Sequence, residues 1–265
     1  MVAESPSIAV LGAGAWGTAL AAAARRAGRT VALWAREADV REAIAGRGEN
    51  TPFLPGIRLP AGLSLPDDPA AAAAEAGIVL LAAPAQHLRQ QLALIAPAVK
   101  PGTPLIVCAK GLERGTARLM TEIVAEAAPG AEAAILSGPS FAEDVARGLP
   151  TAITLAARTL PLAEKLAAAL ASPAFRPYAS SDPVGAAIGG AVKNVLAIAC
   201  GIAEMRRFGG ALGARAETLT GLSGLGDLIL TCTTAQSRNF AVGLGLGSGG
   251  PVRGADGHAR GVVEG

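Results

Sequence analysis

Aromatic residues are scarce in this chain, at 3% of its 265 residues, and its formal net charge is only +2. Nucleic-acid binding generally uses aromatic side chains that stack on bases together with a clustered basic surface, so we expect no nucleic-acid partner. Uncharged apolar runs also fall short of the roughly 18–20 residues that a membrane-spanning helix needs. The N-terminus up to Ser7 lacks the basic cluster of a cleaved signal, and we expect a cytoplasmic protein without a membrane span.

Cysteine and histidine are rare as well. The cysteines are odd in number and lack the spacing of metal ligands, which is typical of buried thiols in a reducing compartment, so we expect no metal site. Of the two histidines, His87 has no carboxylate at an obvious spacing and is interpreted as a helix surface residue. A histidine-centred active site therefore has few candidates. The three cysteines are Cys108, Cys200 and Cys232.

Lysine is the third scarce residue type, with four copies among 23 basic residues. Lysine can lose its proton in a suitable pocket, whereas arginine effectively cannot. Lys110 directly follows an apolar strand, and Lys193 lies among small and apolar residues. Desolvation and a second cation nearby would lower the pKa of Lys193 toward the working range of a general acid or base. Both lysines are therefore candidate catalytic residues, while Lys100 and Lys165 are interpreted as solvent-exposed.

Apolar strands alternate with helix-like segments through the first half of the chain. This alternation predicts an α/β fold with a parallel, doubly wound sheet and helices on both faces. Beyond Tyr178 the strand signals give way to helical ones, so we expect a Rossmann-type domain at residues 1–178 and a smaller all-α substrate domain at 179–265. The expected strands cover 8–11, 30–34, 77–83, 104–109 and 133–136, and the expected helices cover 37–45, 86–96, 116–127, 183–203 and 212–220, besides an alanine-rich helix ending near residue 27.

Three glycines form a G-x-G-x-x-G pattern between the first strand and the alanine-rich helix. Gly12 allows a tight turn, Gly14 lets a pyrophosphate approach the backbone, and Gly17 lets the helix pack closely on the strand. The free N–H groups of the helix N-terminus would then face the phosphates. The pattern alone is weak in a chain with 34 glycines, but its position between strand and helix predicts a dinucleotide cofactor.

The end of the second strand bears on which dinucleotide is bound. An acidic residue at this position suits the ribose of NADH, whereas an arginine accepts the 2′-phosphate of NADPH. Arg36 follows the strand, and Glu37 comes only after it. We therefore expect NADPH as the cofactor, with NADH and a purely solvent-exposed Arg36 left as alternatives.

Polar residues near the end of the chain suggest a phosphorylated substrate. Asp227 lies in an apolar, helix-like run and needs a partner, for which Lys193 or a substrate hydroxyl would serve. Arg238 and Asn239 place a guanidinium and an amide side by side, which suits a phosphate. The segment from Ser137 to Ser140 ends a strand and begins a helix, so its N–H groups form a second candidate anion site.

Seven motifs together resemble bacterial NAD(P)-dependent glycerol-3-phosphate dehydrogenase, and they occur in the order typical of that family. The resemblance implies reversible hydride transfer between a nicotinamide and C2 of dihydroxyacetone phosphate or sn-glycerol 3-phosphate, in the service of phospholipid synthesis. It also suggests a homodimer. The motifs are Gly12-Ala-Gly-Ala-Trp-Gly-Thr-Ala-Leu20, Lys110-Gly-Leu-Glu113, Ser137-Gly-Pro-Ser-Phe-Ala142, Gly190-Ala-Val-Lys-Asn194, Gly224-Leu-Gly-Asp227, Thr231-Cys232 and Ser237-Arg-Asn239.

The resemblance also assigns site residues. It implies Lys193 as the proton carrier, with Lys110 and Asp227 beside it. The implied substrate contacts are Lys110, Gly138, Ser140, Lys193, Asn194, Asp227, Thr231, Ser237, Arg238 and Asn239. The implied cofactor contacts, with the glycine loop, are Ala15, Trp16, Arg36, Lys110, Ala142, Arg238, Val262 and Glu264.

Relative to that family the helical part is shortened. Gly201-Ile202 joins two segments that are usually separated by a glycine-rich turn and most of a helix, and the sequence stops at Gly265.

A Tyr-x-x-x-Lys dehydrogenase is excluded, because Asp182 stands four places after Tyr178, the only tyrosine. Two alternatives remain: a Rossmann-plus-helical dehydrogenase of the hydroxyisobutyrate, 6-phosphogluconate or ketopantoate type, and an NADPH-binding remnant without catalysis.

Overall fold

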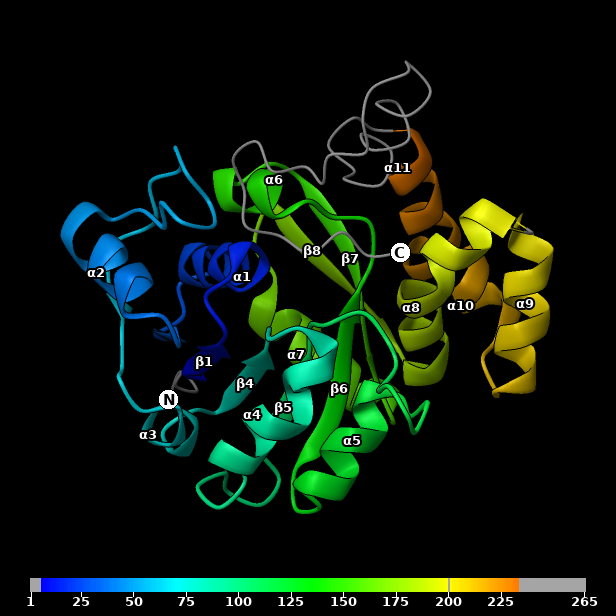
Figure 1. The fold of residues 1–265 in the computed structure, drawn as a ribbon, viewed down its shortest axis with the longest axis horizontal. Helices are drawn as coiled ribbons and strands as arrows, with labels where there is room; N and C mark the ends of the chain where they lie inside the picture. Colours follow the sequence, from blue (N-terminus) through cyan, green and yellow to red (C-terminus); the bar gives the residue numbers. More distant parts are fainter. Residues whose placement is uncertain (1–5, 200, 234–265) are drawn as a thin grey trace.

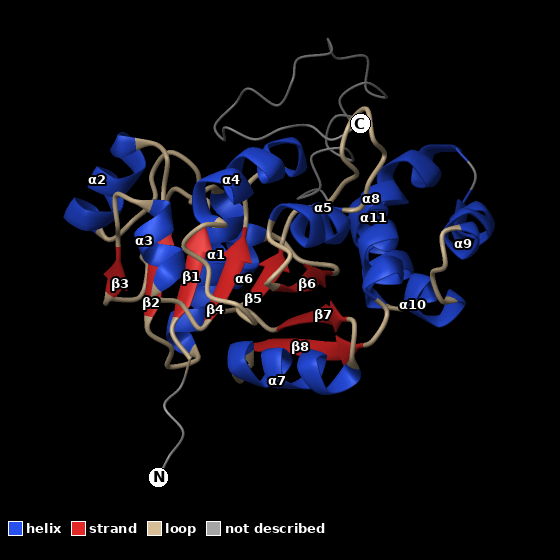
Figure 2. Ribbon diagram, turned by 90° about the horizontal axis from the view of Figure 1, so that it is seen from below, coloured by secondary structure: helices blue, strands red, loops and turns tan. Residues whose placement is uncertain are grey.

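A computed structural model describes residues 6–199 and 201–233 of the chain, without the side chains of 192–199, 201–204 and 231–233. Its centre is one eight-stranded sheet with the strand order β3-β2-β1-β4-β5-β6-β7-β8 (Figure 2). Every neighbouring pair is parallel except β6 and β7, which run antiparallel. The strands are β1 Ile8–Leu11, β2 Val31–Trp34, β3 Leu63–Ser64, β4 Ile78–Leu81, β5 Pro104–Val107, β6 Glu132–Ser137, β7 Thr151–Ala157 and β8 Phe175–Ser180.

Helices cover both faces of the sheet, as the alternating pattern predicts. One buried cluster packs α1, α2, α6 and α7 against the sheet, and the other packs α3, α4, α5 and α8 against the opposite face. All residues of β1 and β4 are buried, because these central strands are covered on both sides. These helices are α1 Ala15–Arg26, α2 Ala38–Arg47, α3 Pro69–Ala74, α4 Leu88–Ile95, α5 Met120–Ala127, α6 Ala142–Arg147, α7 Leu160–Leu170 and α8 Pro183–Ala199, with a short turn η1 at Ala85–His87.

The remaining helices gather around α8 at the end of the sheet where β6 to β8 lie (Figure 1). Asp182 precedes α8 and accepts hydrogen bonds from the backbone N–H groups of Gly185 (2.8 Å) and Arg215 (2.9 Å). One buried carboxylate thereby ties the start of α8 to the start of α10. The predicted Rossmann-type sheet followed by a helical part is confirmed. These elements are α9 Gly201–Ala211, α10 Ala216–Thr220, the π-helical turn η2 Leu222–Gly226 and α11 Asp227–Thr233.

Several details differ from the sequence-based expectation. The sheet is not wholly parallel, since β7 reverses direction against β6, and neither β7 nor β8 was predicted. The helix expected at 116–127 begins only at Met120, because Ala117 has a left-handed φ of 54° and Leu119 pairs back with Leu112. The helix expected at 183–203 divides into α8 and α9, and the one expected at 212–220 shortens to α10 after a left-handed turn at Gly213.

Candidate active site

The carboxyl ends of five parallel strands, β1, β2, β4, β5 and β6, meet at one edge of the sheet. Leu11 at the end of β1 is in register with Trp34 of β2 and Leu81 of β4. Leu81 is in turn aligned with Val107 of β5, and Val107 with Ile135 of β6. The glycine loop, Arg36, Lys110 and Gly138 all follow these strand ends. In open α/β sheets this edge binds the ligand, above all beside the first strand, where the strand order reverses.

The glycine loop has the shape that a dinucleotide requires. Gly12 has a φ of 113°, and a Cβ there would come within 3.0 Å of the backbone of Ala82. A Cβ on Gly17 would overlap the carbonyl oxygen of Gly12, so the loop and α1 pack too closely for a side chain. A Cβ on Gly14, by contrast, would meet none of the described atoms within 4 Å. The loop is therefore tightly packed at Gly12 and Gly17 and open at Gly14, which fits a pyrophosphate lying against the backbone.

The other predicted cofactor residues surround this loop or lie near it. Ala15 and Trp16 are half-buried in the first turn of α1, and Ala142 begins α6, which packs on α1. Arg36 follows β2 with 74% of its side chain exposed, and its guanidinium donates to Glu37 at 2.7 and 3.0 Å. The structure thus presents a solvent-facing cation next to the strand that follows the glycine loop.

Lys110 and Asp227 form an ion pair between the sheet and the helical part. The Nζ atom of Lys110 lies 2.5 Å from Oδ2 of Asp227 and 3.3 Å from the carbonyl oxygen of Gly138. Asp227 is 2% exposed at the start of α11, whereas Lys110 retains 24% of its side-chain exposure. The carboxylate is therefore buried, whereas the side chain of Lys110 is partly accessible to solvent. The sequence predicted that Asp227 needs a partner but did not identify Lys110.

Two glycines let α8 approach this pair. A Cβ on Gly189 would collide with the backbone of Ser223, and one on Gly190 would lie 2.7 Å from the hydroxyl of Ser137 and 3.3 Å from Cγ of Lys110. Side chains at these positions would push α8 away from β6 and from η2. The hydroxyl of Ser137 is buried here, and among the described residues it has no hydrogen-bond partner. Sequence analysis included Gly190 only as part of a family motif and assigned no role to Gly189.

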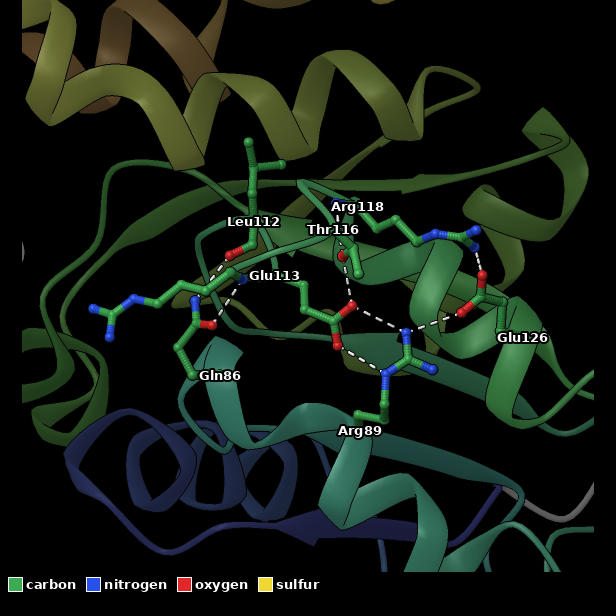
Figure 3. A network of polar contacts seen from close by, with 8 residues as sticks. Gln86, Arg89, Leu112, Glu113, Thr116, Arg118 and Glu126 are labelled. Atoms are coloured by element: carbon green, nitrogen blue, oxygen red, sulfur yellow. Dashed lines mark hydrogen bonds and ion pairs between the residues drawn. The ribbon is translucent and has the colours of Figure 1, made fainter.

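The loop that carries Lys110 is fastened to α4 by a polar network (Figure 3). The side-chain amide of Gln86 donates to the carbonyl of Leu112 (2.8 Å) and accepts from the backbone of Arg114 (3.0 Å). Arg89 makes two hydrogen bonds to the carboxylate of Glu113, at 2.8 and 3.0 Å. Further contacts come from Thr116, Glu126 and Arg118. These contacts begin two residues after Lys110, so they fix the backbone from which its side chain extends.

Hydrogen bonds from Arg89 lower the pKa of Glu113 from 4.5 to about 2, with a further contribution from Thr116. In the folded protein Glu113 therefore stays ionised at any pH near neutrality. Burial acts in the opposite sense on Cys108, at the end of β5, and raises the pKa of its thiol. Cys108 is accordingly an inert packing residue, which confirms for this cysteine the expected buried thiol.

Some predicted residues cannot be placed. Lys193 and Asn194 belong to α8 and Thr231 belongs to α11, but their side chains are outside the described part of the chain. Gly138 accepts a hydrogen bond from Lys110, and Ser140 lies in the turn before α6. Sequence reasoning missed Gln86, Arg89 and Asn50, whose polar contacts support the site from other elements. Ser237, Arg238, Asn239, Val262 and Glu264 lie outside the described residues.

Within residues 6–199 and 201–233, no helix is long and apolar enough to cross a membrane.

Comparison with known protein families identifies the same family that the seven sequence motifs resemble. A family model described as the N-terminus of NAD-dependent glycerol-3-phosphate dehydrogenase matches residues 7–163, and the model of its C-terminus matches residues 201–265.

Curated relatives extend the match over most of the chain. A glycerol-3-phosphate dehydrogenase (NAD(P)+) of Bradyrhizobium sp. strain BTAi1 is 59% identical over 93% of this chain and 81% of its own length. Its counterpart in Parvibaculum lavamentivorans is 52% identical over 97% of this chain and 83% of its own length. The crystal structure of glycerol-3-phosphate dehydrogenase from Coxiella burnetii superimposes with a TM-score of 0.85 at 37% identity, covering 94% of this chain and 82% of that one. The chain belongs to the NAD(P)-dependent glycerol-3-phosphate dehydrogenase family.

Proposed function

We propose that this chain catalyses the reversible reduction of dihydroxyacetone phosphate to sn-glycerol 3-phosphate. Family membership supports the reaction class. The observation that carries the proposal is the Lys110–Asp227 pair, an ammonium anchored by a buried carboxylate at the same sheet edge as an open glycine loop. A cation at that position suits a small anionic substrate whose carbonyl must be polarised beside a nicotinamide.

When bound, the cofactor supplies the hydride that adds to C2 of the substrate. The C2 oxygen then needs one proton, and Lys193 provides it in this proposal. Lys193 is three residues after Gly190, the point at which α8 meets Lys110. Residues three apart on a helix are surface neighbours, and the proposal therefore assigns Lys193 to the site beside Gly190. The positive charge of Lys110 would favour proton release from Lys193, and Asp227 would keep Lys110 in position.

The remaining residues have proposed binding roles. For the substrate, the N–H groups around Gly138 and Ser140 and the side chains of Arg238 and Asn239 are assigned to the phosphate. For the cofactor, the glycine loop takes the pyrophosphate and Arg36 the adenosine end. Further proposed substrate contacts are Asn194, Thr231 and Ser237, and further proposed cofactor contacts are Ala15, Trp16, Ala142, Val262 and Glu264.

NADPH is the proposed cofactor in preference to NADH. The support is the exposed guanidinium of Arg36 after β2, because an arginine there pairs with a 2′-phosphate. Arg36→Ala should weaken NADPH binding about tenfold or more and leave NADH binding nearly unchanged, since only NADPH has the 2′-phosphate. Arg47→Ala, which removes a cation from the end of α2, is the matched control. An unchanged preference in Arg36→Ala would remove this part of the proposal.

In this proposal residues 1–178 contribute the glycine loop and Arg36 to the cofactor site, and residues 179–265 contribute the catalytic lysine. The protein would work in the cytoplasm. It would form a homodimer, and light scattering coupled to size-exclusion chromatography would test this oligomeric state.

The decisive measurement is NADPH oxidation that depends on dihydroxyacetone phosphate. Lys193→Ala should abolish turnover while NADPH still binds, and Lys193→Arg should also be inactive, because arginine keeps the charge but does not release a proton. Lys165→Ala, on the exposed side of α7, should retain full activity. Wild-type rates in Lys193→Ala would end the assignment. Tight NADPH binding by the parent protein without turnover would instead identify a non-catalytic nucleotide binder.

A further inference from the structure

Asn50 is a buried polar residue that lies in the loop between α2 and β3 and has no role in the function proposed above. It is 0% exposed. Its side-chain nitrogen Nδ2 donates two hydrogen bonds, to the carbonyl oxygen of Ala13 (2.8 Å) and to Oγ1 of Thr18 (2.7 Å). Its Oδ1 accepts from the backbone N–H of Phe53 at 3.3 Å. An asparagine side chain has two N–H donors, so both are used inside the protein.

The acceptor of one of these bonds belongs to the glycine loop. The hydroxyl of Thr18 also donates to the carbonyl of Ala13 at 3.3 Å, so two buried side chains hold this one oxygen. The chain has no cis peptide among its described residues. In a trans peptide the N–H points away from the carbonyl of the same unit. A carbonyl of Ala13 that is held inward therefore turns the N–H of Gly14 outward.

The outward side of Gly14 is the open part of the loop. A Cβ on Gly14 would meet none of the described atoms within 4 Å, whereas Gly12 and Gly17 are tightly enclosed. Gly14 is also the residue that precedes the twelve-residue helix α1. An N–H that points into this space joins the free N–H groups of the first helical turn, where phosphate oxygens are bound.

We propose that Asn50 is a positioning residue for the dinucleotide, which sets the direction of the Gly14 N–H through the carbonyl of Ala13. The inference rests on the proposed role of the glycine loop in cofactor binding. Asn50 contacts the Ala13–Gly14 peptide at its carbonyl oxygen, in the protein interior, and leaves the N–H of Gly14 available to a ligand. It should therefore matter for any ligand that places a pyrophosphate on the loop, and equally for NADPH and NADH.

The test compares ligands with and without a pyrophosphate. In Asn50→Ala, the dissociation constants of NADPH and NADH, measured by isothermal titration calorimetry, should both rise about tenfold or more, the loss expected for one hydrogen bond to a charged group. The affinity for adenosine 2′-monophosphate, which lacks a pyrophosphate, should remain within twofold of the parent. A general loss of structure would weaken all three ligands alike.

Two further variants keep the result interpretable. Asp68→Ala removes the N-cap of α3 in the same domain, where its carboxylate accepts from Ala70 and Ala71, and should leave all three affinities unchanged. Should Asn50→Ala fail to fold, as judged by circular dichroism, Thr18→Val removes the second donor to Ala13 and should show the same selectivity with a smaller effect. Dinucleotide affinities within twofold of the parent in the folded variant, or an equal loss for adenosine 2′-monophosphate, would overturn the inference. A parent protein that binds neither dinucleotide would refute the proposed function itself.

Discussion

Asp227→Asn is the sharpest perturbation of the ion pair that links the two parts of the fold. The substitution keeps the shape of the side chain and removes its charge. Lys110 then loses its ion-pair partner and keeps the 3.3 Å hydrogen bond to the carbonyl of Gly138. Breaking a fully buried pair costs about 3–5 kcal/mol. Because Lys110 is 24% exposed, water compensates part of this loss, and a cost of about 1–3 kcal/mol is more realistic here.

Because the pair lies in the proposed substrate site, the lost free energy should lower catalysis more than cofactor binding. If about 1.4–2.7 kcal/mol is lost from the transition state, kcat/KM for dihydroxyacetone phosphate falls about 10- to 100-fold. The dissociation constant of NADPH should change little, since the glycine loop is left intact. The assay is steady-state NADPH oxidation with calorimetric titration of the cofactor. Asp67→Asn, whose carboxylate is 91% exposed and 3.1 Å from Arg41, is the control and should have no effect. A kcat/KM within twofold of the parent in Asp227→Asn would refute the assigned role of this pair.

Two further predictions concern packing and pH. Gly190→Ala should lower kcat and destabilise the fold by about 1–3 kcal/mol, because its Cβ would press on Ser137 and Lys110; Gly210→Ala, in an open part of α9, should instead stabilise by about 0.5–1 kcal/mol in thermal unfolding. Glu113 has a pKa lowered from 4.5 to about 2, so its stabilising contribution is complete above pH 4.5 and is lost as the pH falls toward 2. Melting temperatures of Glu113→Gln and the parent should therefore differ most near neutral pH and converge in acid, and a constant difference would contradict the cause given for the shift.

The fold was predictable because its central strands are apolar throughout. A run such as Ile8–Leu11 is buried on both faces, and the alternation with helices implies parallel neighbours. The reversal at β7 was not predictable in the same way. Thr151–Ala157 is as apolar as a parallel strand, and strand direction depends on the connection and on pairing with β6, which the pattern of apolar residues does not encode.

Site residues at strand ends were predictable, and their partners were not. Lys110 follows an apolar strand, and parallel strands bring their carboxyl ends to one edge, so its placement needs only local information. Its contact with Asp227 spans 117 residues and depends on how α11 packs beside α8. Asn50 was missed for a different reason. In a loop rich in proline and glycine an asparagine is typical of a turn, and only the folded chain reveals that its amide is turned inward against Ala13.

The uneven use of basic residues has a structural explanation at the end of α1 and in the turn that follows it. Arg26 donates to the carbonyls of Val145 and Ala146 at the end of α6, and Arg29 donates to those of Ala168 and Ala169 at the end of α7. Arg25 reaches the carbonyls of Ala61 and Arg29. Each guanidinium thus donates to two carbonyl groups at a helix end or in a loop, which a planar fork of donors achieves better than a single ammonium. The cations in these contacts are arginines, which bind several acceptors and keep their charge. Two of the four lysines lie on the elements that form the site, Lys110 after β5 and Lys193 in α8. In the proposed reaction Lys193 gives up a proton, which an arginine would not do.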